Sequence, residues 1–329
     1  MQTTTLDAAT LETLIRAAVA APSLHNTQPW RYRLDPDTST IEVRAAPERA
    51  LREADPQGRA LHISVGAAVF NLRVAVRHFG WEPVIRLLPR PSEPDHLVSV
   101  RLAGAPRTAR HLDEDFYDAL WRRHSSRVPF SGRQVPADVL SEIAQAADAE
   151  GARLRLPEPG ETSRILQLTA EAERFAVSDP KHRTESRSWV RDGAQDGLPG
   201  AVLGPQDANA RLPVRDFSAL RPADQQPSTR FEQHPVIAVL TTTHDHHADW
   251  LRAGQALERA LLVATVHGVR ASLLHQGLEW PDIRWALRDP RGGGRHVQML
   301  IRLGYGPEGP ASPRRPVRDV LEDVEPGPD

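Results

Sequence analysis

Apolar residues recur three and four positions apart over residues 11–20. This spacing predicts a helix with Asp7 or Thr10 as its N-cap. Pro22 ends the helix, because the residue before a proline avoids the helical region of backbone space. Apolar and polar residues then alternate on both sides of a turn at 35–37, and this alternation predicts a β-hairpin.

The chain beyond the hairpin mixes helical and strand-like patterns, which predicts an α+β fold. The Pro-rich tail, 305–329, is expected to be extended. Helices are predicted at about 58–79, 116–123, 137–147, 161–177, 249–267 and 281–287, and strands at about 83–88, 96–102, 152–156, 236–241, 269–274 and 297–303.

Residues from about 178 to 230 interrupt this order. They are rich in Arg, Asp, Gly and Pro and show little periodicity. Loops of this length inside a compact domain are usually lids, binding loops or disordered segments. Trp189, Leu198 and Phe217 are among the apolar residues in this stretch, and a solvated linker would lack such anchors. We therefore interpret the segment as a lid over a functional site.

Two of the predicted helices resemble each other in sequence. Residues 66–80 can be aligned with residues 254–268, with a glycine at both ends of each, and each helix leads into a strand. A closing glycine is an ordinary helix C-cap, and a small residue at the start would let two helices approach closely. The alternative is two unrelated core helices. The matching strands favour an internal duplication, with halves 1–110 and 111–329 and the lid insertion in the second half.

Composition narrows the classes of function. The 329 residues carry 41 Lys and Arg against 43 Asp and Glu, a formal net charge of -2, so no strong field favours nucleic acid or a membrane as partner. A sequence without cysteine has no disulfides, thiol catalysis, iron–sulfur clusters or cysteine-ligated zinc. The first residues lack a signal-peptide pattern, and no apolar run approaches the length of a membrane span. We therefore expect a soluble cytoplasmic protein.

A basic cluster lies in the second quarter of the chain. Arg123, Ser125 and Arg127 alternate, so an extended backbone points all three the same way. Two guanidinium groups and a hydroxyl suit a phosphate dianion, and each charge-assisted hydrogen bond would contribute roughly 1.5–3 kcal/mol. Arg314 and Arg315 could add a second clamp. The alternative is a solvated helix end, where the helix dipole favours cations.

Two further motifs are interpreted as structural. His244, His246 and His247 follow a predicted strand at spacings that zinc or nickel could use. Adjacent histidines on a loop are more often polar surface, and Asp249 would serve as a helix N-cap. Residues 292–294 are three glycines, but they follow no strand and lack the Lys-Ser/Thr of a phosphate loop, so they predict a turn. No Ser–His–Asp or paired-carboxylate arrangement stands out.

The run Ala21-Pro-Ser-x-x-Asn26-x-Gln28-Pro29-Trp30 resembles the flavin-contacting motif of the nitroreductase family. The helix at 66–80, the cluster at 123–127 and the basic tail at 312–320 are also similar to elements of that family. The length of the chain and the order of these elements resemble the Acg subfamily, in which one chain mimics a nitroreductase dimer. The resemblance covers nearly the whole chain apart from 178–230.

This resemblance implies a nitroreductase-like fold of two fused halves, each with a mixed, mainly antiparallel sheet and long central helices. It implies one noncovalently bound FMN between the halves, with the second pseudo-site empty and Trp30 in the core. No metal and no catalytic side chain are expected, because the flavin supplies the chemistry. The implied cofactor-binding residues are Arg123, Ser125, Arg127, Arg314 and Arg315 at the phosphate, Pro22, Ser23, Asn26 and Gln28 at the pyrimidine edge, and Leu273, Leu274 and His275, through backbone donors, near N5.

Three functions follow from the resemblance and stay open. The first is a reductase that passes a hydride from NAD(P)H through FMN to a nitroaromatic, quinone or other electrophilic acceptor. The second is a protein that stores or sequesters FMN under the lid. The third is a degenerate protein without cofactor that serves as an interaction module. The fused halves predict a monomer or a homodimer, with no nucleic-acid or membrane partner.

Overall fold

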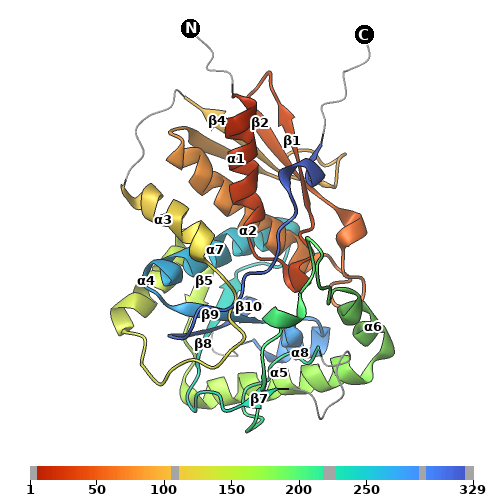
Figure 1. Ribbon diagram of the computed structural model, residues 1–329, viewed down its shortest axis with the longest axis vertical. Coiled ribbons are helices and arrows are strands. Elements are labelled where there is room, and N and C mark those ends of the chain that lie inside the picture. Colours follow the sequence, from red (N-terminus) through yellow and green to blue (C-terminus); the bar gives the residue numbers. More distant parts are fainter. Residues whose placement is uncertain (1–5, 105–110, 218–226, 289–293, 323–329) are drawn as a thin grey trace.

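Two long apolar helices, α2 (Arg59–His78) and α7 (His247–Val266), pack against each other at the centre of the protein (Figure 1). The computed structural model describes residues 6–104, 111–217, 227–288 and 294–322. One sheet lies on the α2 side of this helix pair and a second sheet on the α7 side. The predicted α+β class is therefore confirmed.

The two central helices meet at a pair of glycines. A Cβ atom on Gly66 would overlap the carbonyl oxygen of Leu251, and a Cβ atom on Gly254 would overlap the carbonyl oxygen of Ile63. The two contacts are reciprocal, because Gly66 and Gly254 are separated by the same number of residues as Ile63 and Leu251. Such a self-complementary contact is the mark of a twofold relationship. The close approach that the sequence predicted is confirmed at this crossing.

The first sheet contains residues from both ends of the chain. Its order is β11-β1-β2-β4-β3, antiparallel throughout except for the parallel pair β1·β11. α1 (Ala8–Val19) packs on α2, and Asp7 caps it by accepting a hydrogen bond from the Thr10 backbone. Trp30 is fully buried, as expected. The strands are β1 (Trp30–Asp35), β2 (Thr40–Ala45), β3 (Glu82–Leu87), β4 (His96–Ala103) and β11 (Leu321–Glu322).

The second sheet is antiparallel and has the order β5-β8-β10-β9. The helix predicted at 116–123 begins earlier than expected, at His111. The strands are β5 (Arg153–Arg155), β8 (Val236–Thr242), β9 (Arg270–Leu274) and β10 (His296–Gly304), and the helices of this half are α3 (His111–Arg122), α4 (Ala137–Asp148), α5 (Pro159–Ser178) and α8 (Pro281–Ala286). The tail then crosses back and pairs with β1 of the first sheet. The two halves, 1–110 and 111–329, are therefore not separate structural units, and their origin by duplication stays a prediction.

The insertion at 178–230 contains structure that the sequence did not predict. It opens with α6 (Pro180–Ser188), and later β6 (Gln206–Asp207) pairs with β7 (Ser228–Thr229). α6 is polar on all sides, so periodicity could not reveal it. It is held by the Asp179 carboxylate, which accepts hydrogen bonds from two backbone amides of its first turn, and by His182, whose ring stacks on Trp280 at 4.6 Å.

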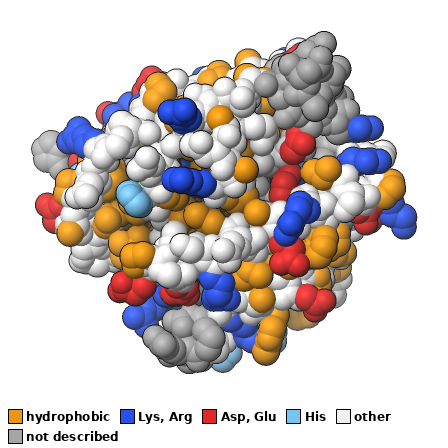
Figure 2. All heavy atoms as spheres, turned by 90° about the horizontal axis from the view of Figure 1, so that it is seen from below, with side chains coloured by type: hydrophobic (Ala, Val, Ile, Leu, Met, Phe, Trp, Pro, Cys, Tyr) orange, Lys and Arg blue, Asp and Glu red, His pale blue; other side chains and the backbone are white. Residues whose placement is uncertain are grey.

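Among the described helices, α2 alone is long and apolar enough to span a membrane by length and composition, which corrects the statement that no apolar run approaches that length. Its most apolar window is 83% buried inside the protein, as for the central helix of a packed core. The face in Figure 2 shows acidic and basic side chains interspersed, in keeping with a net charge near zero.

Candidate functional site

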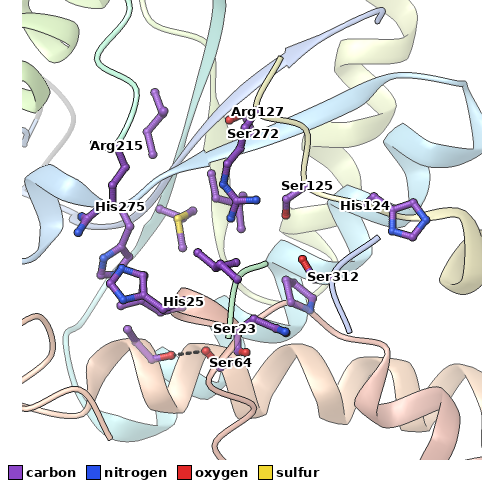
Figure 3. A pocket seen from close by; sticks show the side chains of 18 of the residues that line it. Ser23, His25, Ser64, His124, Ser125, Arg127, Arg215, Ser272, His275 and Ser312 are labelled. Carbon is purple, nitrogen blue, oxygen red and sulfur yellow. Dashed lines mark hydrogen bonds between the residues drawn. The ribbon is translucent and has the colours of Figure 1, made fainter. Parts of the chain in front are cut away.

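A cavity lies where four segments meet: the loop after α1, the first turns of α2, the chain after α3 and the end of β9 (Figure 3). Its empty volume is about 1250 Å³ when the open solvent at its mouth is included. Apolar side chains form much of the wall, among them Ile63, Ala67, Leu257, Leu274 and Met299.

Arg127 is a buried cation in the cavity wall. Its Nη1 donates to the carbonyl of Val202 at 3.2 Å, and no carboxylate of the described residues pairs with it. Burial, reinforced by the charge of Arg215, lowers the pKa of Arg127 to about 10, so the group stays charged at neutral pH. Ser125 lines the same wall, and its backbone forms a parallel bridge with Ala271 at the start of β9. Figure 3 shows Arg127 and Ser125 pointing into the cavity.

Two more guanidinium groups converge beside them. Arg123 and Arg314 both donate to the carbonyl of Ala20, at 3.0 and 3.1 Å. Arg123 forms an ion pair with the fully buried Glu258 at 3.2 Å. Burial and the neighbouring Arg123 lower the pKa of Arg314 to about 9, and its Nε has no partner. Arg123 pairs with Glu258 and Arg314 pairs with no carboxylate of the described residues, so an excess positive charge favours an anion at this end of the cavity.

The side chain of Asn26 is used within the protein. Its Nδ2 donates to the carbonyls of Gly197 at 2.8 Å and Pro313 at 2.9 Å, and its Oδ1 accepts from Arg314 at 3.0 Å. Asn26 therefore joins the loop after α1 to the insertion and to the tail. It lines the cavity, but its amide has little capacity left for a ligand.

Gln28 and Arg315 do not line the cavity. Gln28 donates to the Gln195 carbonyl at 3.0 Å and accepts from the Arg315 backbone at 2.8 Å. The Arg315 side chain turns to the Asp319 carbonyl. Ser23 does line the cavity, and its Oγ accepts from the Gln28 backbone at 2.9 Å. The remaining expected cofactor-binding residues, Pro22, Leu273, Leu274 and His275, all lie in the cavity wall.

The structure adds His25, which the sequence analysis passed over. His25, Asn26 and Gln28 have φ values of 51°, 55° and 50°, in the left-handed region that residues other than glycine seldom adopt. The His25 ring lines the cavity and is buried, and neither nitrogen has a hydrogen-bond partner. Burial lowers the pKa of His25 to about 3, so the ring is neutral. His25 occupies a variable position between Ser23 and Asn26 of the motif, so the motif did not mark it as a candidate binding residue.

His275 is fixed by a buried network. Arg59 donates to His275 Nε2 at 2.9 Å, so the proton lies on Nδ1, which is 3.0 Å from the Glu279 carboxylate. Burial lowers the pKa of His275 to about 4. Glu279 also pairs with Arg215 of the insertion. His275 and Glu279 are four residues apart and flank one short helical turn, whereas Arg59 and Arg215 come from distant segments that no sequence spacing links to them.

The insertion covers part of the cavity. Gly204 packs on Arg127 so closely that a Cβ atom would overlap the Arg127 carbonyl oxygen, and its φ of 73° also favours glycine. The insertion is thus in direct contact with Arg127, the candidate phosphate-binding residue. The insertion residues in the cavity wall are Leu198, Leu212, Val214, Arg215 and Phe217.

The position on α7 that corresponds to the cavity-lining Ala67 carries a side chain held in a polar network. Ala67 lines the cavity, and the residue aligned with it on α7 is Gln255. Gln255 accepts from Arg73 at 2.8 Å, and Glu150 bridges Arg73 at 2.5 Å and Arg259 at 2.8 Å. Ala67 thus faces the cavity, whereas Gln255 is hydrogen-bonded within the protein. The binding of a single FMN per chain stays a prediction.

The histidines after β8 have structural contacts. His246 is the N-cap of α7, with Asp249 completing a capping box, so the helix starts two residues earlier than the sequence suggested. His247 stacks on His62 at 4.5 Å. Over the described part of the chain, no group of three or more His, Asp or Glu residues could hold a metal ion. The turn predicted at 292–294 lies mostly outside the described residues.

Comparison with known proteins agrees with this geometry. A model of the nitroreductase family matches residues 120–305. A protein of Mycobacterium tuberculosis (strain ATCC 25618 / H37Rv), provisionally named NAD(P)H nitroreductase Rv3131, is 32% identical over 325 residues, which cover 96% of this chain and 92% of that protein. Another from the same strain, provisionally named NAD(P)H nitroreductase acg, is 28% identical over 323 residues, covering 94% and 95%.

Solved structures give more distant matches. The FMN-dependent nitroreductase NfnB of Mycobacterium smegmatis, in complex with NADPH, aligns with a TM-score of 0.40 and 13% identity over 65% of this chain and 100% of that chain. A Bacteroides fragilis nitroreductase with bound FMN gives 0.37 and 15% over 64% and 95%. The family model matches more than half of the chain and the first relative spans nearly all of it, so this chain belongs to the nitroreductase family.

Proposed function

We propose that the protein binds one FMN noncovalently in the cavity and acts as an NAD(P)H-dependent reductase of electrophilic acceptors such as nitroaromatics or quinones. The observation that carries this proposal is the un-neutralised cationic end of an otherwise largely apolar cavity. Arg127 has no carboxylate partner among the described residues, and of Arg123 and Arg314 only Arg123 forms an ion pair with Glu258. A phosphate ester attached to an apolar ring system has the matching distribution of charge.

The residues present fit FMN on their own chemistry. Arg314 keeps a buried Nε without a partner and His25 keeps two such nitrogens, and buried polar groups are normally paired. Bound FMN would supply hydride acceptance and donation at its ring. The chain would supply charge pairing through Arg127 and Arg314, apolar packing on the ring, and exclusion of water by the insertion. The relative named as an NAD(P)H nitroreductase supports the choice of reductant.

A second function is favoured by the insertion itself. Five of its side chains line the cavity, and it is fastened by the Arg215–Glu279 ion pair and by the hydrogen bonds of Asn26 and Gln28. A ligand under such a cover would be shielded from other molecules. The alternative is therefore a protein that stores or sequesters FMN and has little reductase activity.

Two measurements test these proposals. Purified protein is mixed with FMN, passed through a desalting column and examined for the visible flavin bands. Their absence from the protein fraction would refute FMN binding and favour the cofactor-free interaction module. Stopped-flow reduction with NADH or NADPH then separates the two flavin functions. Rapid bleaching by either nicotinamide supports the reductase, whereas bleaching by dithionite alone supports storage.

A further inference from the structure

Three polar side chains of the loop between α1 and β1 line the cavity, those of Ser23, His25 and Asn26. Asn26 uses both ends of its amide within the protein. The Ser23 hydroxyl accepts a backbone amide and keeps its O–H to donate. His25 has no hydrogen bond at either nitrogen. Among these three, His25 therefore presents the only side chain with both a donor and an acceptor unused.

We propose that His25, rather than Asn26, is the residue of this loop that hydrogen-bonds the ring system of bound FMN. This inference rests on the proposed function, because it names a contact within that site. It assigns His25 a direct role in holding the cofactor ring.

The burial of His25 makes an unpaired ring costly. The side chain is 5% exposed, and a buried donor or acceptor left without a partner costs about 1–3 kcal/mol. The backbone at His25 also lies in the left-handed region, where a residue persists only when its surroundings enforce it. Packing against Phe217, whose ring centroid is 5.7 Å away, fixes the imidazole but offers no hydrogen bond. Because His25 lines the cavity, a ligand bound there would supply the missing partner.

The position of His25 selects the ring of the ligand over its phosphate. Figure 3 shows His25 and His275 on one side of the cavity and Ser312 and His124 on the other. Arg314, which donates to the Ser312 carbonyl, belongs to the latter side. A phosphate held there leaves the ring system to extend toward His25.

The chemistry of the imidazole agrees. The charged groups that face His25 are Arg215, Arg127 and Glu279, and burial keeps the ring neutral. A neutral imidazole has one N–H donor and one acceptor. The pyrimidine edge of a flavin alternates carbonyl acceptors with an N–H donor, so either tautomer of His25 finds a complement. A phosphate dianion would instead favour a protonated ring.

The test uses the full-length protein, with FMN and riboflavin as probes. Affinity is measured by quenching of flavin fluorescence, and riboflavin lacks the phosphate. His25→Leu should weaken both probes by the same factor, about 3- to 10-fold, the equivalent of one neutral hydrogen bond. His25→Gln keeps a donor and an acceptor and should recover most of that loss. Arg127→Ala should weaken FMN but leave riboflavin unchanged.

His96→Leu is the matched control. His96 is another buried imidazole, but it lies in β4 of the first sheet and does not line the cavity. Its loss should leave both affinities unchanged. An equal weakening by His96→Leu would attribute the effect to general destabilisation and overturn the proposal.

Other outcomes also decide the matter. Unchanged affinity of His25→Leu for both probes would overturn the inference while leaving FMN binding intact. A loss confined to FMN would place His25 at the phosphate and overturn it as well. If the wild-type protein binds neither probe, the proposed function itself fails. Should His25→Leu not fold, His25→Asn is used, because asparagine tolerates the left-handed backbone but is too short to reach the same contact; it should show the same loss.

Discussion

Arg215 and Glu279 form an ion pair in the interior, where the insertion meets the end of the cavity. The charge of Arg215 and the hydrogen bond from His275 outweigh burial and lower the pKa of Glu279 to about 2. One carboxylate thus holds both a side chain of the insertion and a side chain of the cavity wall. The insertion is fastened to the site it covers.

Replacing Arg215 should therefore loosen the cover. In Arg215→Met, Glu279 keeps His275 as a partner, and the insertion loses one charge-assisted contact of roughly 1.5–3 kcal/mol. We expect FMN to dissociate at least about tenfold faster, as measured by the return of flavin fluorescence on dilution. Arg211→Met, an exposed change in the same insertion, should have no effect. Equal dissociation rates in wild type and Arg215→Met would show that the ion pair does not hold the cover closed.

The glycine crossing of α2 and α7 should tolerate no side chain. Gly66→Ala places a methyl group against the Leu251 carbonyl, so the helices must separate. We expect the free energy of unfolding to fall by about 1–3 kcal/mol, as measured by urea denaturation. Gly160→Ala near the start of α5 meets no atom within 4 Å and should leave stability unchanged or slightly raised. A neutral Gly66→Ala would contradict the packing described for this crossing.

Arg127 should distinguish ligands with a phosphate from those without. The loss of a buried guanidinium that pairs with a phosphate should weaken FMN binding by about 10- to 100-fold. Arg122→Ala removes an exposed cation nearby and serves as the control for long-range charge. Both affinities come from equilibrium titration with FMN. If Arg127→Ala binds FMN as tightly as wild type, the phosphate does not lie at Arg127.

Asp55 predicts a pH dependence of stability. Its carboxylate accepts hydrogen bonds from the backbones of Ala60 and Leu61 at the start of α2, yet burial dominates and raises the pKa of Asp55 from 3.8 to about 6. The folded state therefore holds this proton more tightly than the unfolded state. Its contribution to stability is complete below pH 3.8 and is lost as the pH rises through about 6.

Asp55→Asn removes this titration. We expect the variant to gain stability relative to wild type as the pH rises from about 4 to 7, as followed by urea denaturation across that range. Asp37→Asn, in the exposed turn between β1 and β2, should run parallel to wild type at every pH. A constant difference between Asp55→Asn and wild type would show that the Asp55 pKa is not raised.

The frame of the fold was predictable because it rests on local patterns. Apolar spacing gave the helices at α2 and α7, and the paired glycines predicted their close approach. α6 could not be found in this way, because its polar residues are held by the Asp179 cap and by the stacking of His182 on Trp280. Contacts between distant segments override local preference there.

The candidate site shows the same limit. Motifs identified which segments come together, since the loop after α1, the Arg123–Arg127 cluster and β9 all line one cavity. They could not say which atoms are already used. Asn26 is engaged by Gly197 and Arg314, and Arg123 by Glu258. Such partners are set by folding, so a sequence motif names candidates but does not show which of them remain free to bind.

The pairing of β11 with β1 has a consequence for biosynthesis. β1 emerges early from the ribosome, whereas its parallel neighbour at 321–322 and the nearby Arg314 emerge only after the whole second sheet has been made. The first sheet must wait with an open edge while translation proceeds, and the cationic end of the cavity stays incomplete. A ligand that needs Arg314 therefore meets a complete site only after the tail has been synthesised and has paired with β1.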